Sequence, residues 1–134
     1  MKVVVDADVL IGALDRSDPH HAAARALFTA WHESDDTRII SVVNLSEVLV
    51  APAADRTRLR AAREAIAALG ITVHKPGEAI GVEAARLRGA YPISLPDAFC
   101  LATADYADGA LASFDERLLQ AAGAEQIALA GTSK

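Results

Sequence analysis

The sequence predicts an α/β protein in which a central, mostly parallel sheet of four or five short strands lies between two layers of helices. Short β-branched or apolar runs alternate along the chain with longer segments of helical periodicity. Strands separated by helices pair in parallel and are covered on both faces. With 134 residues, 52% of them hydrophobic, the chain suits one domain with a sizeable core. We therefore expect a single domain over residues 1–134, with the last few residues disordered.

The elements follow from local signals. Runs of Val, Ile, Leu and Ala predict strands at 2–5, 38–41, 71–73 and 110–113, and a further edge strand at 126–129. The Ser17-Asp18-Pro19 segment predicts one helix start, and Asn44 followed by Glu47 resembles a capping box at another. Gly70 is a natural helix end. Helices are predicted at 9–14, 18–32, 44–51, 57–69, 76–89, 95–106 and 116–122.

Four acidic residues stand where such a sheet forms its binding sites. Asp6 ends the first strand, Glu47 and Asp97 lie in the first turns of later helices, and Asp115 follows the fourth strand. Each has a local explanation, because a carboxylate caps and stabilises a helix N-terminus. Parallel strands, however, end at one edge of their sheet, so these acids should converge there. A divalent cation would relieve their repulsion, and two such cations assist phosphodiester hydrolysis.

Other chemistries lack the residues they need. The single cysteine, Cys100, excludes an internal disulfide and a Cys-rich zinc site, and the four histidines have no HxxxH or HExxH spacing. The chain has no phosphate-binding glycine loop and no GxSxG elbow. Two tyrosines and one tryptophan indicate no platform for stacking bases. Signal-peptide and membrane-span patterns are also missing, so we expect a cytoplasmic protein without membrane contacts.

The charge is unevenly spread. The net charge is -5, but residues 55–90 carry seven basic and four acidic side chains, so this segment is +3 and the remainder -8. Arg56, Arg60 and Arg63 share one helical face and would contact RNA phosphates or an acidic partner. A solvated helix face explains the same pattern equally well.

Four motifs in series resemble the PIN-domain family of nucleases. The first is a hydrophobic strand ending in D-x-[NSD]-V-L-I, the second surrounds Glu47, the third is an Asp that opens an Ala-rich helix, and the fourth surrounds Asp115. The matching segments are 3–11, 44–49, 95–104 and 111–119. The resemblance spans nearly the whole chain, and its small size is similar to that of VapC toxins of type II toxin–antitoxin systems.

This resemblance implies a metal-dependent endoribonuclease, a phosphodiester hydrolase that cleaves RNA with a metal-activated water. Asp6 and Asp97 would be the principal ligands of Mg²⁺ or Mn²⁺, and Glu47 and Asp115 would complete the catalytic acidic site. The implied partners are a cognate antitoxin protein, the RNA substrate and a second copy of the chain in a homodimer.

Two positions depart from the family pattern. Asp8 stands where Asn or Ser is more usual, which adds a fifth acid that would change the number or kind of metal ions. Ser113 replaces the usual Thr, and its hydroxyl would bond a site carboxylate or a bridging water, or else cap the local turn.

Two rival interpretations remain. A haloacid-dehalogenase-type phosphatase would use Asp6 as nucleophile and Asp8 as acid–base residue, but the chain is short for that fold and Leu10 departs from its motif. A PIN fold without activity would serve only as a binding module, although all four acids are present.

Overall fold

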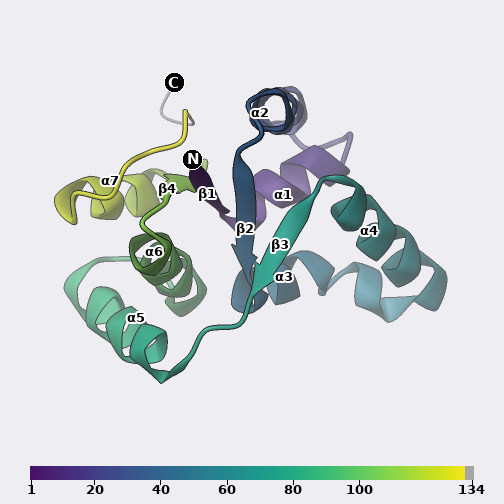
Figure 1. Cartoon of the computed structure of the whole chain (residues 1–134). Coiled ribbons are helices and arrows are strands. Elements are labelled where there is room, and N and C mark those ends of the chain that lie inside the picture. The colour runs from purple at the N-terminus through teal and green to yellow at the C-terminus, as the bar shows by residue number, and fades with distance from the viewer. Residues whose placement is uncertain (132–134) are drawn as a thin grey trace.

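A four-stranded parallel sheet forms the centre of the computed structural model, which describes residues 1–131 (Figure 1). The strands are β1 (Lys2–Val5), β2 (Thr37–Ser41), β3 (Ile71–His74) and β4 (Ala110–Ala112). Their order across the sheet is β3-β2-β1-β4, and each neighbouring pair is parallel. The α/β class and the parallel sheet are thus confirmed. The fifth strand is reduced to an isolated parallel bridge between Leu111 and Leu129.

Within residues 1–131, seven helices cover the sheet as two layers (Figure 1). Helices α1 (Ala7–Leu14), α2 (His21–Glu33), α3 (Val42–Leu49) and α4 (Arg56–Ala68) contribute to one buried cluster, and a 3₁₀ turn, η1 (Pro52–Ala54), precedes α4. Helices α5 (Glu78–Ala90), α6 (Leu95–Ala107) and α7 (Glu116–Ala124) contribute to the other. This is the predicted three-layer arrangement. Within residues 1–131 we find no helix that is both long and apolar enough to cross a membrane.

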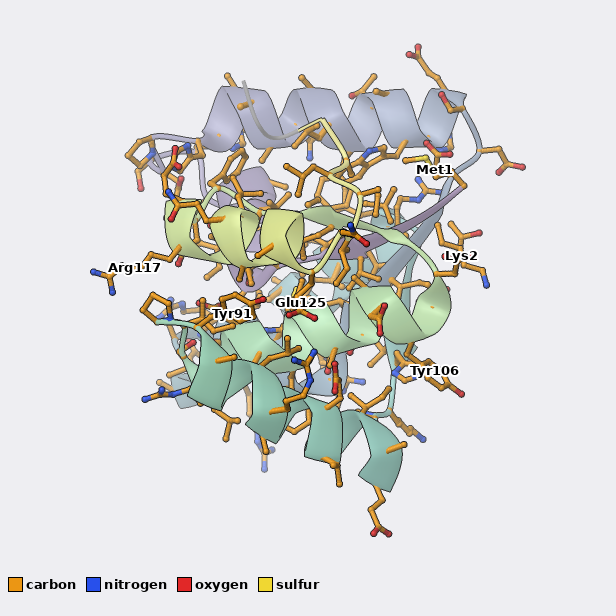
Figure 2. The ribbon with its side chains drawn as sticks, turned by 90° about the vertical axis from the view of Figure 1, so that its left-hand side faces the viewer. Met1, Lys2, Tyr91, Tyr106, Arg117 and Glu125 are labelled. Atoms are coloured by element: carbon orange, nitrogen blue, oxygen red, sulfur yellow. The ribbon has the colours of Figure 1, made fainter. Side chains whose placement is uncertain are left out.

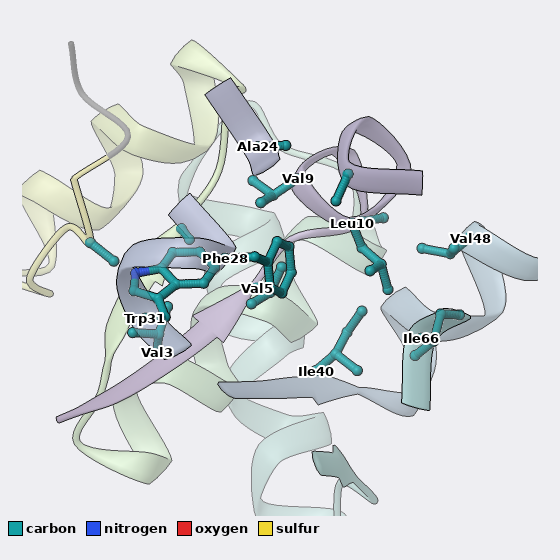
Figure 3. Packing of buried hydrophobic residues seen from close by; sticks show 14 of the residues in the cluster. Val3, Val5, Val9, Leu10, Ala24, Phe28, Trp31, Ile40, Val48 and Ile66 are labelled. Atoms are coloured by element: carbon teal, nitrogen blue, oxygen red, sulfur yellow. The ribbon is translucent and has the colours of Figure 1, made fainter. Parts of the chain in front are cut away.

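Alternation along β1 builds both cores. Val3 and Val5 belong to the cluster under α1–α4, where Figure 3 shows them near Phe28 and Trp31, and Val4 belongs to the cluster under α5–α7. All three valines are fully buried. Burial of one such side chain stabilises the fold by about 1.5–3 kcal/mol. Because β1 packs helices against both faces, it is a rigid base for the residues at its carboxyl end.

Helices α1 to α5 each begin one to three residues from the predicted start, and hydrogen bonds explain two of these differences. Helix α3 begins at Val42 because the Ser41 hydroxyl, at the end of β2, accepts a hydrogen bond from Val43 N (3.3 Å) and caps the helix. The capping-box interpretation of Asn44 is therefore wrong, and Glu47 lies in the second turn rather than the first. Helix α2 begins at His21, since the Asp18 carboxylate accepts from His20 N (2.8 Å) and closes a turn before the helix.

The end of α4 agrees with the prediction. Gly70 follows α4 with φ +70°, a left-handed conformation that favours glycine. The turn lets the chain enter β3 at once. The expected disorder of the last residues concerns 132–134, which lie outside the described residues.

Candidate active site

The carboxyl ends of β1 and β4 bring the first and fourth motifs together. Asp6, which directly follows β1, is 3% exposed and accepts hydrogen bonds from Ala7 N (2.7 Å) and from Ser113 Oγ (2.7 Å). Two residues further, Asp8 accepts a hydrogen bond from Phe114 N through Oδ2 (3.1 Å). Since β1 and β4 are neighbours in the sheet, residues from opposite ends of the chain form one acidic site.

Ser113 serves both functions considered from the sequence. Its hydroxyl donates to Asp6 Oδ2 and also accepts a hydrogen bond from Asp115 N (3.0 Å). Asp115 in turn caps α7, because its Oδ1 accepts from the backbone N–H groups of Arg117 (2.9 Å) and Leu118 (3.3 Å). The local capping explanation of Asp115 is correct, and the same turn places its carboxylate beside the other acids.

Asn44 connects α3 to α6. Its side chain is fully buried, and Nδ2 donates both to Glu47 Oε1 (3.1 Å) and to the carbonyl of Pro96 (3.1 Å). Asp97, the next residue, lies in the first turn of α6, whose N-cap Ser94 accepts a hydrogen bond from Asp97 N (3.2 Å). Asn44 therefore brings Glu47 and Asp97 to the same end of the sheet.

The five carboxylates act on one another electrostatically. Burial raises the pKa of Asp6 well above its usual range, and the charges of Asp8 and Asp97 raise it further. Burial, together with the charge of Asp115, raises the pKa of Asp8 to about 6 against the hydrogen bond from Phe114. Burial also raises the pKa of Asp97, and the charges of Asp115 and Glu47 act in the same direction. The convergence predicted from the sequence is present.

The ion pairs within residues 1–131 leave this charge unbalanced. Within residues 1–131, none of the ion pairs involves any of the five carboxylates. Asp8 Oδ1 and Asn44 Oδ1 are buried and have no hydrogen-bond partner. Oxygen donors of this kind suit Mg²⁺ or Mn²⁺, so the donor chemistry fits a hard divalent cation.

The side chains supply the right kind of metal-binding atom, but they are not arranged as a complete set of metal ligands. In the described part of the chain, no three His, Cys, Asp or Glu side chains already stand as a metal-binding group. Asp6 directs both carboxylate oxygens to hydrogen-bond donors, and Asp115 caps its helix. Each carboxylate oxygen has a second lone pair, so these hydrogen bonds orient the side chains and leave oxygen donors for a metal.

The predicted basic residues lie elsewhere. Arg56, Arg60 and Arg63 are exposed on α4 and line a shallow groove with Leu59 and Glu64, away from the acidic site. Their shared face is confirmed, but the structure does not bring them to the carboxylates. A contact with RNA there would be a separate surface.

Two site features were missed from the sequence. Asn44 has a visible signal, a polar residue one turn before Glu47, but its contact with Pro96 depends on how α3 and α6 pack. The second feature is a stacked pair of rings, His20 and Phe114, beside Asp8. Nothing in the spacing of these two residues predicts their contact.

The fold and the acidic site together define an α/β domain with carboxylates gathered at the carboxyl end of a parallel sheet. The family model of the PIN domain matches residues 3–124. That match covers most of the chain, so the chain belongs to the PIN domain family.

Several solved structures have this fold. A toxin–antitoxin complex from Klebsiella pneumoniae is 24% identical, with a TM-score of 0.68, 84% of this chain covered and 86% of that one. VapC20 of Mycobacterium tuberculosis, a sarcin-ricin loop cleaving toxin, is 16% identical, with a TM-score of 0.72 and coverages of 89% and 94%. VapBC-1 of nontypeable Haemophilus influenzae is 13% identical, with a TM-score of 0.73 and both chains fully covered. At these identities the similarity establishes the fold, and the search among curated proteins found no match.

Proposed function

We propose that this protein is a divalent-metal-dependent endoribonuclease and the toxin of a VapBC-like toxin–antitoxin system. The observation that carries the proposal is the set of five carboxylates that converge at the sheet edge and form no ion pair with any cation within residues 1–131. A structural cluster of acids would normally be paired, because unpaired buried charge is destabilising. A site kept in this state is suited to an external cation.

We assign a role to each residue of the site from its burial and its hydrogen bonds. Asp6 and Asp97 are the proposed principal ligands, since both are partly or fully buried acids at the centre of the mutual repulsion. Glu47, Asp115 and Asp8 complete the acidic site. Ser113 and Asn44 position Asp6 and Glu47 through their hydrogen bonds. A bound Mg²⁺ or Mn²⁺ would supply positive charge for the phosphodiester and activate the attacking water.

RNA is the proposed substrate. Family membership supports a nuclease, and one solved structure of similar fold is described as a toxin that cleaves the sarcin-ricin loop. RNA as a target also places the proposed site of action in the cytoplasm. The Arg56, Arg60 and Arg63 face would attract RNA phosphates from outside the acidic site. Replacing all three by Gln should reduce the salt dependence of RNA binding by up to about one unit of slope per lost contact.

A cognate antitoxin is the proposed protein partner. One solved structure of similar fold is described as a toxin–antitoxin complex. A groove of about 550 Å³ runs between α1, α3 and α4. Its apolar lining includes Ile11, Leu14 and Val48, and Glu47 of the acidic site is at its wall. A segment docked there would cover Glu47, and an Arg or Lys on it would pair with the acids.

A homodimer is also proposed. Val50 and Val82 are 73% and 66% exposed, and an interface would remove apolar side chains of this kind from water. Sedimentation at high protein concentration measures the association directly. A strictly monomeric protein would contradict the dimer and leave the nuclease proposal untouched.

The decisive experiment compares cleavage of a stem-loop RNA with Mn²⁺, with Mg²⁺ and with excess EDTA. We expect internal cleavage with the metals and none with EDTA. Asp97→Asn should abolish it, whereas Asp105→Asn, an exposed acid later in α6, should not. Undiminished cleavage in EDTA would overturn metal dependence. Metal binding without cleavage of any RNA would favour the inactive binding module.

A further inference from the structure

Two rings stack at the rim of the acidic site. The His20 imidazole and the Phe114 ring lie with their centroids 4.3 Å apart and their planes 11° from parallel. His20 comes from the turn before α2, and Phe114 from the connection between β4 and α7. Of the three ring pairs within residues 1–131, this is the one with parallel rings.

The pair is attached to the site through the backbone of Phe114. Phe114 lies between Ser113 and Asp115, and its N–H donates to Asp8 Oδ2 (3.1 Å). Its ring is half-buried and packs against the core cluster under α1–α4. The ring therefore has a fixed position one residue from two members of the acidic site.

His20 is held from both sides but keeps its ring accessible. Its N–H donates to Asp18 Oδ1 (2.8 Å), and its carbonyl accepts from Ala24 N (2.8 Å). The residue is exposed, and none of the hydrogen bonds in the described part of the chain involves its ring nitrogens. Phe114 covers one face of the imidazole, so a planar ligand has the other face available.

An exposed, prearranged ring beside a phosphodiester site suits an unpaired nucleobase. Proteins that bind single-stranded nucleic acid stack bases on aromatic and histidine rings next to a backbone-binding site. A purely structural ring pair would gain more from burial than from one open face. Duplex RNA offers no splayed base, so such a platform would discriminate against it.

Although the count of tyrosines and tryptophans predicted no stacking platform, we propose that His20 and Phe114 form one for the unpaired base next to the scissile phosphate. The platform selects single-stranded or loop RNA and orients its backbone toward the carboxylates. This inference rests on the proposed nuclease function. It assigns His20 and Phe114 to substrate positioning and leaves the bond-breaking step to the acidic site.

The first test measures cleavage of a stem-loop RNA with Mn²⁺, with each loop base intact or replaced in turn by an abasic nucleotide. His20→Ala should raise KM about tenfold and change kcat less than twofold, as expected for the loss of one stacked base. His20→Tyr should restore the low KM. His32→Ala, an exposed histidine of α2 outside the platform, should behave as the wild type.

Removal of the stacked base should give the same loss as removal of the ring. At one loop position, the abasic RNA should raise KM for the wild type about tenfold and leave His20→Ala unchanged. If the two proteins respond equally to base removal at every position, the platform is wrong. Cleavage of the intact RNA by the wild type, measured in the same series, tests the nuclease proposal separately.

A second measurement needs no cleavage. The same stem-loop carries 2-aminopurine in its loop, whose fluorescence falls when the base stacks. Titration with the Asp97→Asn protein should quench it, and the Asp97→Asn, His20→Ala protein should quench it less, with thermal melts confirming that both are folded. Equal quenching by the two proteins would overturn the platform even if the RNA were never cut.

Discussion

Two clusters of acids in this molecule have pKa values shifted in opposite directions: those beside Arg86 are lowered, and those at the sheet edge are raised. On the α5–α7 side, Arg86 donates to both oxygens of Glu83 (2.9 and 2.7 Å) and to Glu125 (2.7 Å). Tyr91 donates to the other oxygen of Glu125, and Figure 2 shows these two residues together. Hydrogen bonds from Arg86 lower the pKa of Glu83 and of Glu125. At the sheet edge, the pKa values of Asp6, Asp8 and Asp97 are raised.

The difference lies in the cation and not in the acids. In the Arg86 cluster (Arg86, Glu83, Glu125 and Tyr91), the arginine neutralises the negative charge, so the cluster has no need of an external cation. Its ion pairs lie at the surface and contribute modestly to stability. Within residues 1–131 the acidic site forms no ion pair, so protons or an external cation would relieve its repulsion. The candidate active site therefore differs from an ordinary ion-pair cluster in having negative charge that no ion pair within residues 1–131 balances.

The largest expected effect separates the two clusters by activity. Asp97→Asn, or Asp6→Asn, should reduce RNA cleavage by about 100-fold or more, because each removes a charged oxygen donor from the site. Glu83→Gln removes an acid from the Arg86 cluster and should leave cleavage unchanged. Initial rates with Mn²⁺ measure both, and equal losses in the two variants would show that the comparison carries no functional meaning.

Metal should stabilise only the incomplete cluster. At a Mn²⁺ concentration about 100 times Kd, binding to the folded state contributes about 2.7 kcal/mol, or roughly 5–10 °C in Tm for a domain of this size. Thermal melts with Mn²⁺ and with EDTA give the shift. Asp97→Asn should lose most of it and Glu83→Gln should keep it. A full shift in Asp97→Asn would reduce Asp97 to a helix-start carboxylate.

Acidification should change the contributions of the two clusters to the free energy of unfolding in opposite directions. Asp8 has a folded pKa of about 6, above its unfolded value, so the metal-free fold binds more protons than the unfolded chain between about pH 4 and 6. The penalty is full at pH 7 and fades as pH falls through 6, which should raise the free energy of unfolding by about 1–2 kcal/mol. The lowered pKa values of Glu83 and Glu125 give stability that is lost only below about pH 4.

Denaturant melts of the metal-free protein between pH 7 and 5 measure this gain. The Asp8→Asn protein is the matched control, because it lacks the group whose raised pKa is invoked, and it should show a smaller gain. A wild-type stability that falls steadily from pH 7 would contradict the assigned repulsion.

The smallest effect concerns the completed cluster. Arg86→Gln leaves Glu83 and Glu125 without their cation and should lower Tm by no more than about 2 °C, because the pairs are at the surface. The loss should shrink at high salt, where surface charges are screened. RNA cleavage should be unaffected. A large loss of activity in Arg86→Gln would mean that the two clusters are coupled through α5 and α6.

Much of the acidic site was predictable because its positions follow local rules. Asp6 directly follows the β-branched strand β1, Asp115 comes three residues after the end of the apolar strand β4, and Asp97 comes three residues after the helix-capping Ser94. Parallel strands of one sheet then place these positions at a common edge. The start of α3 was not predictable in the same way, since Ser41 and Asn44 are both good capping residues and only the end of β2 selects Ser41.

The sequence by itself determined how strands and helices alternate along the chain, the fold class, and which acids lie at the carboxyl edge of the sheet. Hydrophobic periodicity and capping act over a few residues, so they can be read along the chain. Only the tertiary structure decided that Asn44 bridges Glu47 and Pro96, that Ser113 bonds Asp6, and that His20 stacks on Phe114. The tertiary structure also decided that Arg86 forms an ion pair with Glu125, which is distant in sequence. These contacts join residues distant in sequence, and their geometry is set by the packing of the helices on the sheet rather than by local preference.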